Sequence, residues 1–137
     1  MPIRPAVLAA VVLVLAGAVP AVGQRAFPPD ALTNLQVLPA DTPPREIVPM
    51  MRGFSQGLGV RCQFCHVGRE GQPLDQFDFA SDAVAAKQTA RAMMRLVRSI
   101  NDQLAKTQPQ AARVTCFTCH RGAEHPVHAP AKPGVRR

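Results

Sequence analysis

The sequence predicts an all-α, loop-rich fold that forms a single domain. Its 137 residues are enough for one domain and too few for two of ordinary size. Apolar residues recur at helical spacing in two segments, whereas no segment of useful length alternates apolar and polar residues as a strand does. Fourteen prolines and nine glycines break the rest of the chain into loops.

The N-terminal segment has the pattern of a secretory leader. Arg4 supplies a positive start, residues 6–19 are apolar, and residues 21–23 form a small-residue cleavage site. Residues 1–23 are therefore predicted to be a signal peptide that sends the chain to the periplasm, and a leader that is retained would anchor it to the membrane. The three prolines of residues 24–41 predict an extended arm.

The first predicted helix covers residues 42–58. Thr42 is a suitable N-cap, and a proline follows it at the first helical position. Pro49 is unfavourable inside a helix because it lacks an N–H and clashes with the preceding turn, so the helix is expected to kink there or to begin nearby. The apolar face consists of Ile47, Met50, Met51, Phe54 and Leu58.

The second predicted helix is the longest element of the chain. It begins at Ser81, a good N-cap, and runs without Gly or Pro to Lys106. Its cations lie largely off the apolar stripe and predict a solvated face. The stripe consists of Ala86, Met93, Val97, Ile100 and Leu104, and the cations are Lys87, Arg91, Arg95 and Arg98.

All four cysteines fall in two copies of one pattern, C-x-x-C-H. The copies are Cys62-Gln63-Phe64-Cys65-His66 and Cys116-Phe117-Thr118-Cys119-His120. This pattern is the attachment signature of c-type haem, because two thiols at this spacing form thioethers with the vinyl groups of one porphyrin. The sequence therefore predicts two covalently attached haems c, with His66 and His120 as proximal iron ligands.

Three other uses of paired cysteines compete with haem attachment. A disulfide framework suits an exported protein but gives no reason for the two histidines. A Cys₄ zinc site accepts C-x-x-C pairs, although the 50 residues between Cys65 and Cys116 are a long gap for one. A thioredoxin-like redox motif needs a βαβ context, which this sequence does not offer.

Methionines occur in pairs upstream of both motifs, each pair on a predicted helix. Met51 lies 11 residues before the first motif, and Met93 lies 23 residues before the second. A thioether ligand raises the haem potential relative to a second histidine. Met51 and Met93 are therefore predicted to be distal iron ligands, with Met50 and Met94 as alternatives, and the unit of helix, connector and C-x-x-C-H occurs twice.

Both units resemble haem-binding segments of the photosynthetic reaction centre cytochrome c subunit family. The similar segments are residues 90–101, 114–122 and 51–66. The resemblance covers about residues 34–122 and implies a dihaem domain over residues 42–122, half of the four-haem subunit. It also implies that Met51 and Met93 are sixth ligands, although the family's spacing before the second motif selects Met94.

The function predicted from these observations is single-electron transfer by an exported dihaem cytochrome. Its partners would be a redox protein donor and acceptor, and the resemblance implies a photosynthetic reaction centre as an acceptor. A haem enzyme or gas sensor with one five-coordinate haem, of the peroxidase-like kind, is the alternative. The formal net charge of +7, or +6 once Arg4 is lost with the leader, favours an acidic or membrane-bound partner. No small-molecule substrate is expected, nor nucleic acid outside the cytoplasm.

Two further features complete the expectations. Aromatic residues make up only 4% of the chain, so two porphyrins are expected to supply the apolar area that a core of this size needs. Residues 123–137 are rich in proline and basic residues and are predicted to be a disordered tail. His125 and His128 in that tail are expected to be solvated and not to bind iron.

Overall fold

The computed structural model describes residues 26–126 and residue 129. The elements follow in the order α1 (Pro44–Leu58), η1 (Cys62–Phe64), η2 (Leu74–Gln76), α2 (Ala85–Thr107) and α3 (Cys116–His120). Within this part of the chain, extended backbone pairs only at a single bridge between Val67 and Asp78. The predicted all-α, loop-rich fold class is confirmed. The predicted signal peptide and most of the predicted tail lie outside the described residues.

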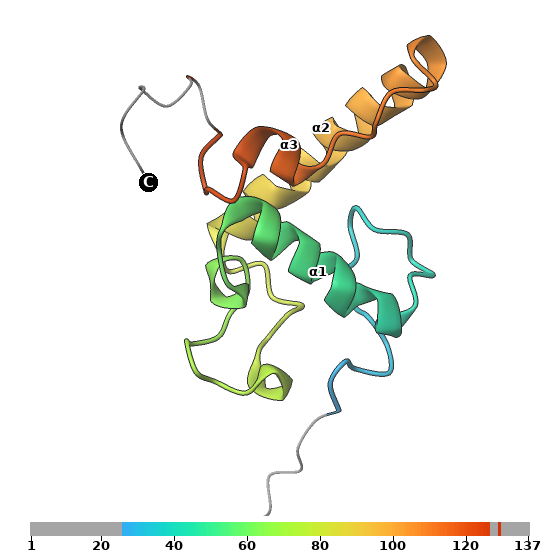
Figure 1. Ribbon diagram of the computed structural model, residues 1–137. Helices are drawn as coiled ribbons and strands as arrows, with labels where there is room; N and C mark the ends of the chain where they lie inside the picture. Colours follow the sequence, from blue (N-terminus) through green and yellow to red (C-terminus); the bar gives the residue numbers. More distant parts are fainter. Residues whose placement is uncertain (1–25, 127–128, 130–137) are drawn as a thin grey trace, which may run out of the picture.

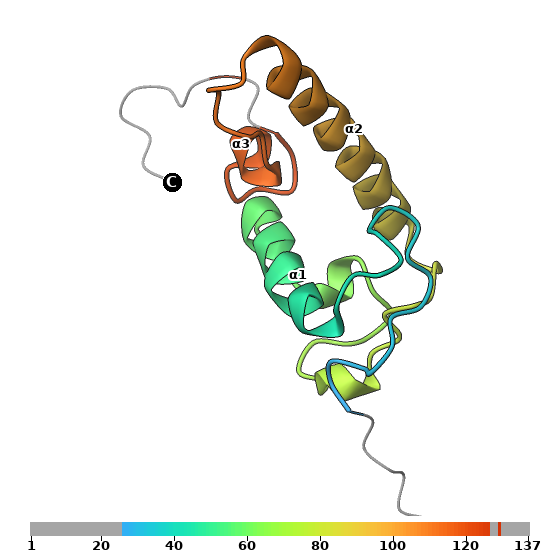
Figure 2. The same ribbon diagram turned by 90° about the vertical axis from the view of Figure 1, so that its right-hand side faces the viewer.

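The helices lie on two sides of the molecule. The long helix α2 occupies one side, and α1 with α3 occupies the other (Figures 1 and 2). The short helix α3 packs against the C-terminal end of α1. An irregular arm, residues 26–43, crosses α2, where Arg91 donates to the backbone oxygen of Asn34 and Arg98 donates to that of Val37. The arm therefore joins the first part of the chain to α2.

The start of α1 differs from the prediction. Pro43 occupies the N-cap position and Pro44 the first turn, where a missing N–H costs nothing. Thr42 instead turns its hydroxyl back to donate to the backbone oxygen of Pro39 at 2.7 Å. Pro49 lies inside α1 without ending it. The helix ends as expected, at Gly59 in the left-handed conformation with φ of 66°.

The start of α2 also differs from the prediction. The helix begins at Ala85 with Val84 as its N-cap residue, four residues after Ser81. Ser81 accepts a hydrogen bond from the Ala83 N–H but does not cap the helix. The reason is that residues 79–82 bind side chains of α2 itself, which holds them out of the helix. The other end of α2, at Thr107, lies one residue beyond the predicted end at Lys106 and two residues before Pro109.

The faces of α2 differ in part from the prediction, since Arg95 and Arg98 are exposed as expected but two other cations are not. Its buried residues are Lys87, Arg91 and Asn101, so the prediction of a solvated basic face is wrong for the two cations. They are buried because the arm and the segment before α2 supply oxygen acceptors for them. The apolar stripe is only partly covered, and Met93 at its centre is 43% exposed.

Few apolar side chains are buried in the described part of the chain. Val37 and Phe77 are the only buried hydrophobic residues in that part. Phe77 lies in a small aromatic cluster in which its ring and that of Phe27 both contact Phe79. No helix among the described residues is long and apolar enough to cross a membrane. The polypeptide by itself therefore buries little apolar surface.

Candidate functional site

The first C-x-x-C-H motif directly follows α1. Cys62 begins the 3₁₀ turn η1, and the N–H groups of Cys65 and His66 both donate to the Cys62 backbone oxygen, at 3.2 and 3.0 Å. One tight turn therefore carries both thiols and the histidine. Burial, followed by the charge of the neighbouring Cys62, raises the pKa of Cys65, which favours the thiol over the thiolate.

The second motif forms the helix α3. Thr115 precedes it, and its N–H donates to the Thr118 hydroxyl at 3.0 Å, which fixes the start of the turn. Burial also raises the pKa of Cys116. The turn is closed by Arg121 in the left-handed conformation and by the N–H of Gly122, which donates to the Gly57 oxygen of α1 at 3.0 Å. The second motif is thus seated on the end of the first helix.

The contact between α1 and α3 is close enough to require glycine. A β-carbon at Gly57 would lie 3.0 Å from the Cβ of Cys116 and 3.1 Å from the Phe117 nitrogen. Gly59, two residues later, approaches the backbone of Gly122 even more closely. The helix that carries Met51 of the first unit therefore also supports the cysteines of the second unit.

The two motif histidines have different surroundings. Nδ1 of His120 donates to the backbone oxygen of Ala123 at 3.1 Å, which leaves the lone pair of Nε2 free for a metal. His66 is partly buried, with its ring edge-on to Phe79 at a centroid distance of 4.9 Å, and its Nδ1 is buried without a hydrogen bond. Burial, followed by the positive charge of Lys87, lowers the pKa of His66, which favours the neutral form that binds iron.

The methionines lie on the two long helices. Met50 and Met51 are partly buried on α1, and Met94 is partly buried beside the polar face of α2. Met93 lies on the partly exposed apolar stripe of α2. In the predicted tail, His125 is exposed and lies 3.8 Å from Glu124, whereas His128 lies outside the described residues.

The residues present fit covalently bound haem. No disulfide joins the four cysteines in the structure, which leaves their thiols free to attach a cofactor. Over residues 26–126, no three His, Cys, Asp or Glu side chains come together to hold a metal ion, so the cysteines do not form the Cys₄ site of the zinc hypothesis. The apolar side chains Met93, Leu96 and Phe117 are 43%, 51% and 58% exposed. A large flat apolar group with an iron centre matches both the donors and this surface.

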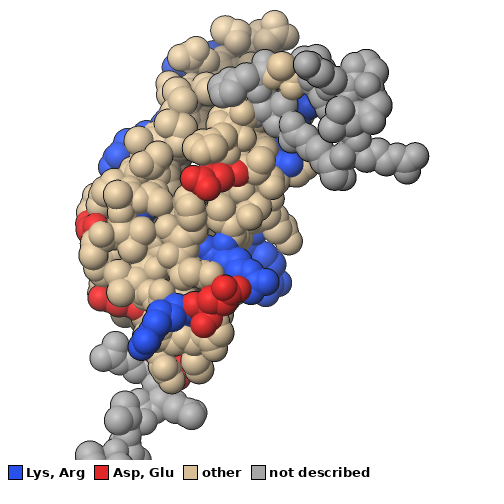
Figure 3. Space-filling view, turned by 90° about the vertical axis from the view of Figure 1, so that its left-hand side faces the viewer, with Lys and Arg blue, Asp and Glu red and all other residues tan. Residues whose placement is uncertain are grey.

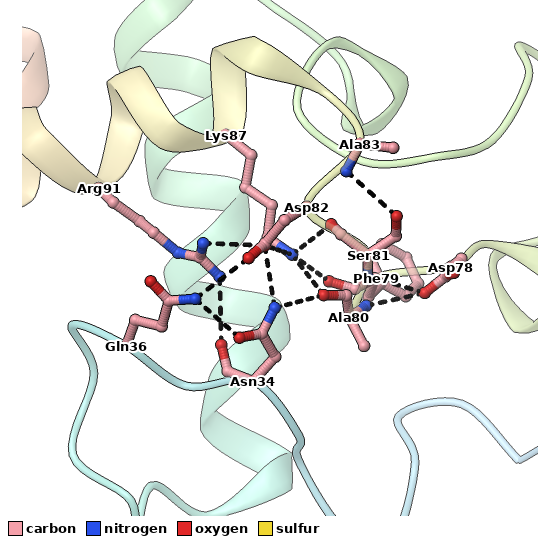
Figure 4. A network of polar contacts seen from close by, with 10 residues as sticks. All are labelled: Asn34, Gln36, Asp78, Phe79, Ala80, Ser81, Asp82, Ala83, Lys87 and Arg91. Atoms are coloured by element: carbon pink, nitrogen blue, oxygen red, sulfur yellow. Dashed lines mark hydrogen bonds and ion pairs between the residues drawn. The ribbon is translucent and has the colours of Figure 1, made fainter.

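A polar network next to the first motif was not foreseen from the sequence. Asp82 lies 2.8 Å from the guanidinium of Arg91 and 3.2 Å from the ammonium of Lys87 (Figure 4). The same carboxylate accepts hydrogen bonds from the amides of Asn34 and Gln36 in the arm. The sequence signal was that the two cations are four residues apart and share a face of α2, but nothing local pointed to the arm.

A second unforeseen residue, Asn101, holds the connector that leads to the second motif. Its side-chain amide donates to the Val114 oxygen at 2.9 Å, and its oxygen accepts from the Val114 N–H at 2.8 Å. Asn101 is buried, and this pair of bonds satisfies the backbone of Val114 completely. The connector is therefore fixed to α2 two residues before Cys116.

Comparison with known proteins shows that the chain has relatives. A family model described as the photosynthetic reaction centre cytochrome C subunit matches residues 71–133. Cytochrome c-554 of Chloroflexus aurantiacus is 37% identical over 92 residues, which are 66% of this chain and 20% of that protein. The photosynthetic reaction center cytochrome c subunit of Rubrivivax gelatinosus is 31% identical over 91 residues, 58% of this chain and 23% of the relative. The subunit of the same name from Thermochromatium tepidum is 37% identical over 68 residues, 50% and 15% of the two chains.

These matches confirm the resemblance that the motifs indicated. The chain spans about a fifth of the length of the curated relatives that it matches. No solved structure matches it significantly.

Proposed function

Because this chain is a relative of the photosynthetic reaction centre cytochrome c subunits, we propose that it is a c-type cytochrome that carries single electrons on two covalent haems. The observation that carries the proposal is that each C-x-x-C-H motif is folded as a single turn, so that two thiols and an imidazole are presented together. The hydrogen bond from His120 Nδ1 to Ala123 supports it further, because it leaves Nε2 free for iron.

The proposed roles follow from the chemistry of each side chain. Haem supplies an iron that is reduced and oxidised by one electron. Cys62 and Cys65 hold one haem and Cys116 and Cys119 hold the other, through thioethers. His66 and His120 would be the proximal ligands of the two irons and a methionine would be the distal ligand of each, which would leave no iron site for a substrate.

The methionine assignments are Met51 for the first haem and Met93 for the second. Met51 is supported by its place on α1, which leads directly into the first motif. Met93 is supported by its central place on the apolar stripe of α2, which presents uncovered apolar surface. Met50 and Met94 are the neighbours against which these assignments must be tested.

We further propose that the protein acts outside the cytoplasm and exchanges electrons with other redox proteins. The leader pattern of residues 1–23 supports export. Two of the relatives are named as photosynthetic reaction center subunits, which makes a reaction centre the first acceptor to test. On the face shown in Figure 3, basic side chains form small separate patches instead of one broad surface. Docking through a few charge contacts, weakened by salt, is therefore expected.

A haem assay tests the proposal directly. Purified holoprotein should give two haems per chain in a pyridine haemochrome measurement, and a chain without haem would refute the proposal. The reduced protein should bind carbon monoxide slowly, because both axial positions are filled. Rapid binding at one haem would instead indicate a haem enzyme or gas sensor with a five-coordinate iron.

Methionine variants test the distal ligands. Met51→His and Met93→His should each remove, from one haem, the long-wavelength absorption band of thioether-ligated ferric haem, and should lower that haem's reduction potential. Met50→His and Met94→His are matched controls, one residue away on the same helices, and should leave the band in place. Loss of the band in a control variant would reassign the ligand to that neighbour.

A further inference from the structure

The side chains of Lys87 and Arg91 are the only buried charged groups in the described part of the chain. The ammonium of Lys87 donates to three consecutive backbone oxygens, those of Phe79, Ala80 and Ser81, at 2.9, 3.0 and 2.7 Å (Figure 4). An ammonium has three N–H donors, and these acceptors can use all of them. The charge is therefore held in a fixed place and is fully hydrogen-bonded.

The ammonium of Lys87 and the ring of His66, the histidine of the first motif, both contact Phe79. Phe79, whose backbone oxygen binds Lys87, also places its ring against the ring of His66. Phe79 therefore connects the fixed ammonium of Lys87 to the proposed ligand of the first iron.

The second motif has no such neighbour in the described structure. The buried polar residue that supports it is Asn101, which is neutral and binds only the backbone of Val114. Lys87 is therefore expected to act mainly on the first haem, whereas Arg91, two residues before Met93 on α2, also lies close to the proposed ligand of the second haem.

We propose that Lys87 raises the reduction potential of the first haem more than that of the second, with Asp82 setting the size of the effect. This inference rests on the proposed function, because it requires haem at Cys62 and Cys65. Lys87 is a positioning residue in this scheme, since it acts on the iron through space and through the surroundings of His66.

The physical basis is the charge of the haem in its two states. Reduction adds one electron to ferric iron, takes up no proton at Lys87, and makes the haem more negative by one unit. A fixed positive charge in a medium of low dielectric constant stabilises the reduced state more than the oxidised state. Asp82 opposes this effect, but its side chain is 36% exposed whereas those of Lys87 and Arg91 are 11% and 7% exposed. Water therefore screens the anion more than the cations.

The experiment is a spectroelectrochemical titration of the holoprotein and two variants. Lys87→Gln removes the charge and keeps N–H donors for the backbone oxygens, and it should lower the potential of the first haem. The expected change is roughly tenfold in the equilibrium constant for reduction, or about 59 mV for a one-electron couple. Asp82→Asn should shift the same couple upward. The α1 methionine variants identify which couple belongs to the first haem.

Lys106→Gln is the matched control, because Lys106 is an exposed lysine in the last turn of the same helix. It should leave both couples unchanged.

Shifts of opposite sign in the reduction potential of the first haem, downward in Lys87→Gln and upward in Asp82→Asn, distinguish an electrostatic role from a structural one. Loosening of the fold would expose the haem and lower its potential in both variants, so a downward shift in Asp82→Asn would overturn the proposal. An equal shift of both couples in Lys87→Gln, or no shift, would overturn it as well. If Lys87→Gln does not fold, the sign in Asp82→Asn decides. Haem content is measured on every sample, so failure to bind two haems is recognised separately as failure of the proposed function.

Discussion

The two C-x-x-C-H motifs have the same pattern but are held in place by different means. The first is a 3₁₀ turn directly after α1, and its histidine lies against Phe79 and near two buried cations. The second is a helix, α3, whose histidine is oriented by a backbone oxygen and whose connector is fixed by a neutral amide. Two motifs with the same sequence pattern therefore have different surroundings, and under the proposed function these surroundings would give the two haems different properties.

The largest effect is expected when the two cysteines that attach one haem are replaced. The double variants Cys62→Ser/Cys65→Ser and Cys116→Ser/Cys119→Ser should each leave a product that is unfolded or degraded. Val37 and Phe77 alone are too little buried apolar surface to offset the conformational entropy of the chain. Far-UV circular dichroism and limited proteolysis of each purified variant measure this.

A double variant that stays folded would show how much each unit depends on its own haem. If the first double variant unfolds and the second keeps its helical signal, the first haem alone organises the core. If both apoproteins are well folded, the polypeptide needs neither haem for its core, contrary to our expectation.

Much of the fold could be predicted because its signals are local. The helical spacing in two segments, the end of α1 at Gly59 and the end of α2 before Pro109 all depend on residues close in sequence. The motifs were equally local, since each lies within five consecutive residues. These features need no knowledge of what packs against them.

The rest depended on contacts between distant residues. The start of α2 could not be read from Ser81, because the segment before the helix binds Lys87. The burial of Arg91 depends on Asn34, which is 57 residues away. Amphipathicity showed that α2 has two faces, but it could not show that the arm covers the polar face and leaves the apolar face partly exposed.

An intermediate effect is expected from a substitution at the contact between α1 and α3, where the two units meet. Gly57→Ala should destabilise the holoprotein by about 1–3 kcal/mol, because the new methyl group would press on the Cβ of Cys116 and the backbone of Phe117. The thioether at Cys116 would keep that atom from moving away. Denaturant unfolding followed by circular dichroism gives the free energy of unfolding.

Gly53→Ala is the control for that change. A β-carbon at Gly53, on the same helix, would meet nothing within 4 Å. Alanine is the better helix former, so this variant should be more stable than the wild type by about 0.5–1 kcal/mol. Stabilisation by Gly57→Ala as well would show that α1 and α3 are not in close contact.

The smallest expected effect is the pH dependence contributed by Asp82, whose ion pairs with Lys87 and Arg91 lie near the first motif and not near the second. The hydrogen bond from Arg91, followed by those from Asn34 and Lys87, holds the pKa of this carboxyl well below its usual value. A carboxyl with a lowered pKa stabilises the fold above its unfolded pKa of about 3.9, and this contribution is lost as the pH falls further. The stability difference between wild type and Asp82→Asn should therefore be constant near neutrality and shrink below about pH 4.

Thermal unfolding from neutral to strongly acid pH measures that difference. Asp102→Asn is the matched control, because Asp102 is an exposed carboxylate on α2, and its difference from wild type should not follow the same course. Comparison with wild type at each pH cancels the effect of acid on the proposed iron ligands, which all three proteins share. A difference for Asp82→Asn that does not change with pH would mean that its carboxylate gains nothing from the cations. The surroundings of the first motif would then be electrostatically no different from those of the second.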